Sequence, residues 1–134
     1  MKRAMFVGRW QPFHNGHKWL IDQKLLAKKS ILIAVRDIPP DEANPLTTEQ
    51  TMHILNVAYE NSDVEIIAIS DIESVNFGRG VGYEVNEFVP PNNIGRISAT
   101  QIREGIRTGD QTWKQNVPKA VHTLIQEYLL KVGE

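Results

Sequence analysis

The chain has 134 residues, which suits a single domain over residues 1–134 with one core. Its net charge of -1 lacks the basic excess that nucleic-acid-binding proteins usually show. It has no cysteine, which excludes disulfides and thiolate metal sites, and its first apolar run is too short for a signal peptide or a membrane span. We therefore expect a soluble cytoplasmic protein with no membrane partner.

The first half of the chain alternates short apolar runs with amphipathic stretches. Residues 4–7 are predicted to form a strand that ends at Gly8, followed by a helix over residues 16–28 with Asn15 as its N-cap. Residues 31–35 form an unbroken apolar run, typical of a strand covered on both faces, and residues 36–45 form a proline-rich loop. Thr47 and Gln50 then predict a capping box at the start of a second helix, and residues 64–69 a third strand.

In the second half, residues 70–82 form a loop that contains glycine. The alternating segment "YEVNEFV" predicts a fourth strand near an edge of the sheet. The segment "ATQIREGIRTGD" indicates a short helix that ends at Gly109, and the last helix has Pro118 in its first turn.

This order of elements predicts an α/β fold. Strands that alternate with helices favour a three-layer, Rossmann-like parallel sheet with helices on both faces. Ligands of such folds bind at the carboxyl ends of the strands. The segment "GRWQPFHNGH", residues 8–17, follows the first strand and therefore lies at that place.

The chemistry of this segment points to a phosphate site. Gly8 permits a sharp turn and a close approach to a ligand, and the helix that follows directs its free N–H groups at the same spot. His14 and His17, three residues apart, can share one face of that helix start. A cap or surface role for the two histidines and a metal site remain alternatives, although two histidines alone do not complete a zinc site.

A second candidate segment is "ISATQIRE", residues 97–104. Ser98 and Thr100 place hydroxyl groups at a predicted helix start, and Arg103 adds a forked cation one turn further along. Such a combination also occurs in helices without a ligand.

Together these segments resemble the motifs of the HxGH nucleotidylyltransferase superfamily, which includes the small cytidylyltransferases. The superfamily pattern Gly-x-Phe-x-Pro-x-His-x-Gly-His is matched by Gly8, Trp10, Pro12, His14, Gly16 and His17. "ISATQIRE" resembles the ISSTxIR signature of the same superfamily. The forms "GRWQPFH", "NPLTTEQ" and "GDQTWKQNVPKAV" are most similar to the archaeal type of nicotinamide mononucleotide adenylyltransferase.

The resemblance implies an enzyme that transfers a nucleoside monophosphate, AMP from ATP, to a small phosphate-bearing acceptor and releases pyrophosphate. It implies catalytic roles for His14, His17 and Arg103. The residues implied to bind the nucleotide and its phosphates are Gly8, Arg9, Trp10, Gly16, Ser98 and Thr100. Mg²⁺ is expected to be carried by the nucleotide phosphates, without a metal site in the protein, and the relatives imply a homo-oligomer.

The acceptor and the base stay open at this point. The chain is shorter than the archaeal-type enzymes between the third strand and "GYEV", and its loop after the second strand differs from theirs. Three residues in these regions, Arg36, Asp37 and Arg79, are candidates for binding the acceptor. A transferase that uses CTP or another acceptor is one alternative, and a nucleotide-binding module without catalysis is another.

Overall fold

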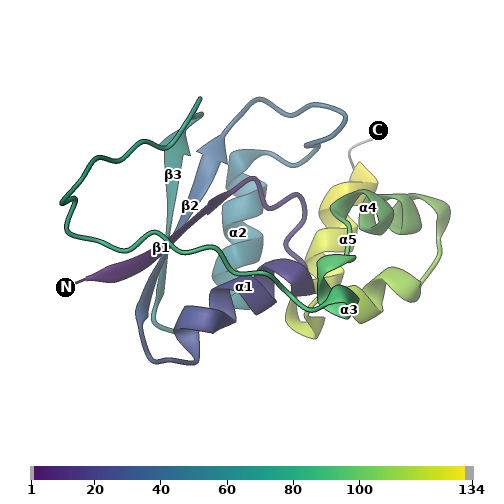
Figure 1. Cartoon of the computed structure of the whole chain (residues 1–134). Coiled ribbons are helices and arrows are strands. Elements are labelled where there is room, and N and C mark those ends of the chain that lie inside the picture. Colours follow the sequence, from purple (N-terminus) through teal and green to yellow (C-terminus); the bar gives the residue numbers. More distant parts are fainter. Residues whose placement is uncertain (1, 132–134) are drawn as a thin grey trace.

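The structure, a computed structural model, describes residues 2–131 and is built around a short parallel sheet (Figure 1). Its elements in chain order are β1 (Arg3–Gly8), α1 (Asn15–Leu25), β2 (Ser30–Asp37), α2 (Thr48–Ala58), β3 (Val64–Ser70), α3 (Asn92–Gly95), α4 (Ala99–Thr108), the 3-10 helices η1 (Thr112–Asn116) and η2 (Lys119–Val121), and α5 (His122–Lys131). No helix formed by residues 2–131 is long and apolar enough to cross a membrane. The predicted Rossmann-like α/β fold is confirmed.

The carboxyl ends of the three parallel strands lie at the same edge of the sheet. The strands pair in parallel in the order β1-β2-β3, with Gly8 beside Val35 and Val35 beside Ala68. The turn that follows β1 therefore lies next to the carboxyl end of β2. This is the edge at which parallel sheets bind ligands.

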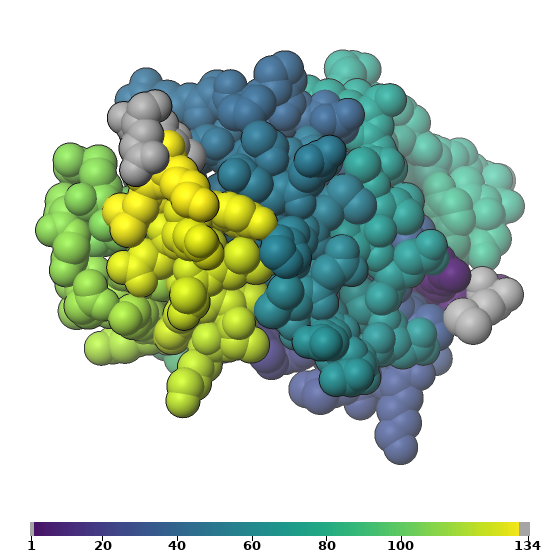
Figure 2. Space-filling view, turned by 180° about the vertical axis from the view of Figure 1, so that it is seen from behind, coloured from purple at the N-terminus to yellow at the C-terminus, as the bar shows by residue number. Residues whose placement is uncertain are grey.

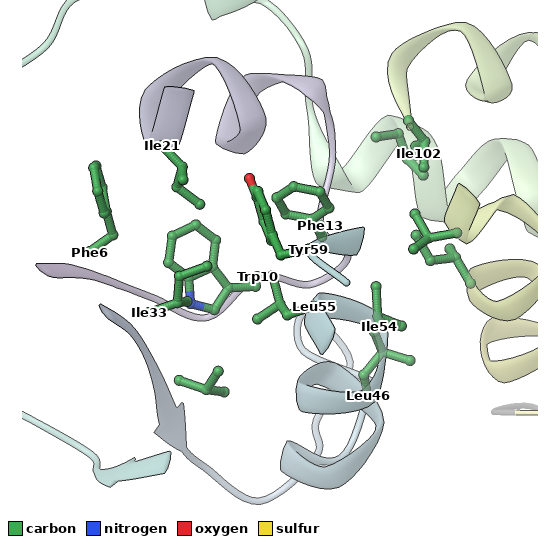
Figure 3. Packing of buried hydrophobic residues seen from close by; sticks show 14 of the residues in the cluster. Phe6, Trp10, Phe13, Ile21, Ile33, Leu46, Ile54, Leu55, Tyr59 and Ile102 are labelled. Carbon is green, nitrogen blue, oxygen red and sulfur yellow. The ribbon is translucent and has the colours of Figure 1, made fainter. Parts of the chain in front are cut away.

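Helices α1 and α2 pack on one face of the sheet. Right-handed crossovers between strands in the order β1-β2-β3 place both connecting helices on that face. The rings of Phe13 and Tyr59, whose centroids are 5.5 Å apart, pack between the two helices (Figure 3). The sequence predicted helices on both faces of the sheet, but within residues 2–131 the helices that pack on the sheet lie on this face only. Met5, on the opposite face, is 56% exposed.

The carboxy-terminal helices extend the core beside α2. Figure 2 shows α5, in yellow, lying along α2, and a hydrogen bond of 2.6 Å joins the ring of His53 to the hydroxyl of Tyr128. The largest fully buried apolar side chains of the core are Phe13, Ile21, Ile31, Ile33, Val35, Leu46, Ile54, Leu55, Ile102, Val121 and Ile125. The core thus reaches from the sheet through α2 to α4 and α5, which fixes α4 relative to β1.

Two local predictions are confirmed and one is wrong. Thr47 and Gln50 form the predicted capping box of α2, and Gly109 ends α4 with a left-handed φ of 82°. Residues 83–89, predicted as a strand, form no strand; their side chains are exposed apart from Phe88, which is half-buried. A strand needs a partner edge to satisfy its backbone groups, and no strand of residues 2–131 pairs with this segment.

Candidate functional site

The turn after β1 is shaped by Trp10. Its φ of 55° lies in the left-handed region, which side chains other than glycine seldom adopt. The indole is 3% exposed and donates a hydrogen bond of 3.2 Å to the carbonyl of Ala34. A Cβ atom on Gly8 would lie 2.9 Å from the indole ring, so this position requires glycine. The structure therefore places Trp10 in the core, where it contacts the site through the ring of His17.

The two histidines of the motif cap helix α1. His14 is the N-cap, and its Nδ1 accepts a hydrogen bond of 3.0 Å from the N–H of Gly16. His17 reaches back, and its Nδ1 accepts from the N–H of His14 at 3.3 Å. Together they form a capping box, which Ser or Thr with Glu or Gln usually provides. The prediction of Asn15 as the N-cap is wrong, because Asn15 is the first helical residue and donates to the carbonyl of Gln115.

This capping box sets the proton positions on both rings. Each Nδ1 accepts a backbone hydrogen bond, so the proton of each neutral imidazole lies on Nε2. The rings stack with centroids 3.8 Å apart, and a Cβ atom on Gly16 would lie 2.7 Å from the His14 ring. Neither Nε2 has a protein acceptor among residues 2–131. The site thus holds two neutral N–H donors side by side at a helix N-terminus.

Burial keeps both rings neutral near pH 7. It lowers the pKa of His14 to about 4. Burial also lowers the pKa of His17 to about 3, with a smaller contribution from the neighbouring His14. Neutral rings can donate to phosphate oxygens without a charge that the core would have to accommodate.

These pKa values predict a loss of stability in mild acid. Because both folded-state pKa values lie below the ordinary value near 6.5, the unfolded chain binds more protons than the folded one as the pH falls below 6.5. Each ring then removes about 1.4 kcal/mol of unfolding free energy per pH unit. Urea unfolding at pH 7 and pH 5 measures this loss. The double variant His14→Asn/His17→Asn should lose much less, whereas His53→Asn should behave as the wild type does. An equal loss in the double variant would contradict the assignment.

Arg103 joins the second motif to the first. Its Nη1 donates a hydrogen bond of 2.7 Å to the carbonyl of Gln11, and its Nη2 donates to the hydroxyl of Thr100 at 3.3 Å. Ser98 is the N-cap of α4 and accepts from the N–H of Gln101. The two predicted motifs are therefore brought together in space, with the guanidinium beside the turn that leads to His14.

The loop that carries Asp41, here called the acidic loop, faces Arg9 and Arg103. The carboxylate of Asp41 accepts hydrogen bonds from the backbone and side-chain N–H groups of Asn44. These bonds, with a further contribution from Arg9, lower the pKa of Asp41. Burial lowers the pKa of Arg103, and the charge of Asp41 opposes this shift. Arg9 and Arg103 thus lie in the field of one carboxylate, a feature that the sequence did not indicate.

The three candidate acceptor residues have other positions. Arg36 pairs with Asp71 at 2.6 Å and donates to the carbonyl of Ile72, which ties down the segment after β3. Asp37 accepts a hydrogen bond of 2.8 Å from the hydroxyl of Thr48 at the start of α2. Arg79 is exposed in the segment over residues 71–91. Their predicted role in acceptor binding is not tested by these contacts.

Comparison with known proteins finds relatives that are similar over most of the chain. The chain is 29% identical to a nicotinamide-nucleotide adenylyltransferase of Ignicoccus hospitalis, over 93% of this chain and 91% of the relative. It is 29% identical to that of Picrophilus torridus, over 93% and 90%, and 28% identical to that of Pyrobaculum neutrophilum, over 94% and 88%. Over most of its length the chain is thus similar to nicotinamide-nucleotide adenylyltransferases, in agreement with the resemblance that its motifs indicated. No family model matches the chain.

The alignment with the Ignicoccus hospitalis protein also shows that the two chains differ in length within the region that they share. The alignment with the Ignicoccus hospitalis protein has 157 positions, more than the 134 residues of this chain. Because 93% of this chain is about 125 residues, about 32 aligned positions are gaps in it. Within the aligned region the chain is thus shorter than this relative, which agrees with the predicted shortening.

Proposed function

We propose that this enzyme transfers AMP from ATP to nicotinamide mononucleotide and releases pyrophosphate. The observation that carries the proposal is the pair of imidazoles that caps α1 and lies beside Arg103. The curated relatives carry the name nicotinamide-nucleotide adenylyltransferase, which favours ATP and this acceptor over CTP.

The site supports a direct, in-line transfer. A phosphate oxygen of the acceptor attacks the α-phosphorus of ATP, a new P–O bond forms, and the bond to the β-phosphate oxygen breaks as pyrophosphate leaves. The attacking oxygen is already anionic, so the protein has to supply position and charge stabilisation and no general base. We assign the Nε2–H donors of His14 and His17 to the α-phosphoryl oxygens, where negative charge develops.

Arg103 would bind the leaving phosphates. A guanidinium has five N–H donors, and two of them bind Gln11 and Thr100. Within the described part of the chain, three donors remain for the β- and γ-phosphates. Arg9 would add a second cation, and the hydroxyl groups of Ser98 and Thr100 lie at the helix start that faces the same phosphates.

The divalent cation would enter with the nucleotide. Residues 2–131 contain no group of three or more His, Asp and Glu side chains that could hold a metal ion. The donor set of the site, neutral imidazoles and guanidinium groups, suits anions and not cations. We therefore propose that Mg²⁺ binds as part of the Mg–ATP substrate, held by phosphate oxygens and water. A homo-oligomer and a cytoplasmic location remain our proposals.

The test is NAD formation by the purified protein with Mg²⁺, ATP and nicotinamide mononucleotide. We expect NAD and pyrophosphate in equal amounts, and no product when EDTA removes the metal. CTP in place of ATP, and phosphopantetheine or glycerol 3-phosphate in place of the acceptor, should react far more slowly. Turnover with one of these and not with ATP and nicotinamide mononucleotide would keep the chemistry and reject the proposed substrates.

A further inference from the structure

We propose that the buried side chain of Gln11 is a positioning residue that holds Arg103 in place for nucleotide binding. The proposal rests on the proposed function for its kinetic part. Gln11 lies between the turn that follows β1 and the histidines, and it is 6% exposed. None of the roles assigned to the motif uses this side chain.

The amide of Gln11 pairs with one backbone residue in both directions. Its Nε2 donates to the carbonyl of Leu46 at 3.1 Å, and its Oε1 accepts from the N–H of Leu46 at 2.9 Å. Both bonds are buried, and they join residues 35 positions apart in the chain. A buried amide with both ends bonded is held in a single rotamer, because either bond, once broken, leaves an unsatisfied polar group.

The main chain of Gln11 passes this constraint to Arg103. Its carbonyl accepts the 2.7 Å hydrogen bond from Nη1 of Arg103, the shortest contact that the guanidinium makes to the first motif. The preceding residue, Trp10, has a positive φ, so the backbone here adopts a conformation that tertiary contacts must hold. The side chain of Gln11 thus fixes the carbonyl that orients the guanidinium.

The same side chain also places the acidic loop. Leu46 is fully buried and closes the loop that begins at Asp41. Asp41 is in turn bonded to Asn44, two residues before Leu46. One glutamine therefore links the histidine turn, the loop with the carboxylate and the arginine of α4. Without its two side-chain bonds, the turn and the loop lose this direct link, and the carbonyl that binds Arg103 is less firmly held.

A glutamine that only satisfies its own burial would affect folding and leave Arg103 unchanged, so the test reads Arg103 directly. The Nε–Hε signal of Arg103 is followed by NMR in protein labelled with nitrogen-15 arginine and is assigned by its absence in Arg103→Lys. Gln11→Met keeps the volume and removes both hydrogen bonds. Gln11→Glu keeps the bond from the N–H of Leu46. This variant is used in place of Gln11→Met if the latter does not fold. Gln23→Met is the matched control, since within residues 2–131 the side chain of Gln23 bonds to Trp19 of its own helix and to no other element.

We expect the Arg103 signal to move and to exchange faster with solvent in Gln11→Met, and to stay unchanged in Gln23→Met. An unchanged signal in a folded Gln11 variant overturns the proposal. This readout needs no substrate, so it decides the matter even if the wild-type protein forms no NAD, a result that would reject the proposed function alone.

The kinetic part is a double-mutant cycle. Gln11→Met should lower kcat/KM for ATP about tenfold in the wild-type background, as expected for a lost buried hydrogen bond. In the Arg103→Ala background the same change should cost less than about twofold, because its effect passes through the missing guanidinium. An equal loss in both backgrounds contradicts a role through Arg103.

Discussion

Replacing His17 with alanine should lower kcat for AMP transfer by about 100- to 1000-fold, the usual effect of removing one preorganised donor. The ring of His17 is fixed from three sides: by the N–H of His14, by the stacked ring of His14, and by the edge of Trp10. Its proton is therefore held on Nε2 before the substrate binds. Alanine removes this donor and leaves the developing charge on the α-phosphoryl group less stabilised.

The measurement is kcat at saturating ATP and nicotinamide mononucleotide, with a thermal melt to show that the variant is folded. His17→Asn is a useful second variant, because its amide can accept from the N–H of His14 but does not reach as far as Nε2. His53→Ala, in an exposed position on α2, is the matched control and should retain full activity. A folded His17→Ala enzyme with kcat within about threefold of the wild-type value would rule out the proposed role.

Removing the cation at position 103 should have an effect of similar size, but on kcat/KM. We expect Arg103→Ala to lower kcat/KM for ATP by about 100-fold or more, because charge-assisted hydrogen bonds to two phosphate groups are lost together. Arg103→Lys should recover only part of the loss. Lysine carries the charge but cannot bond to the carbonyl of Gln11 and to phosphate with the fixed fork of a guanidinium.

Arg107 provides the control on the same helix. It is exposed and pairs with Glu104 on the surface of α4, so Arg107→Ala removes one positive charge without touching the site. Its kcat/KM should stay within about twofold of the wild-type value. A similar loss in both variants would show that overall charge, and not the position of Arg103, determines nucleotide binding.

Much of the fold and of the site could be predicted because the signals are local. Apolar runs bounded by glycine and polar residues located β1, β2 and β3, and Thr47 with Gln50 identified the start of α2 from the capping chemistry alone. The histidine motif was found by residue type and spacing, and the ISATQIRE segment by its resemblance to a family signature. That Arg103 lies beside the first motif is a tertiary result, since the hydrogen bond to Gln11 spans 92 positions.

The wrong predictions have a common cause. The alternation in residues 83–89 is typical of a strand, but a strand forms only by pairing with another one. Within residues 2–131 this segment pairs with neither outer strand of the sheet. Asn15 is a good N-cap by residue type, yet His14 takes that position because the ring of His17 returns to its backbone. Neither pattern contains the information about its partner.

The sequence by itself determined the order of elements, the turn at Gly8, and the residue types that we propose bind phosphate, because these depend on propensities and spacing within a few positions. Only the structure decided which ring nitrogen of each imidazole carries the proton, since this depends on the backbone groups that face Nδ1. It also decided that Trp10 lies in the core and that Gln11 bonds to Leu46. The positions of Trp10 and Gln11 depend on partners distant in the chain that satisfy their buried polar groups, which no local pattern reveals.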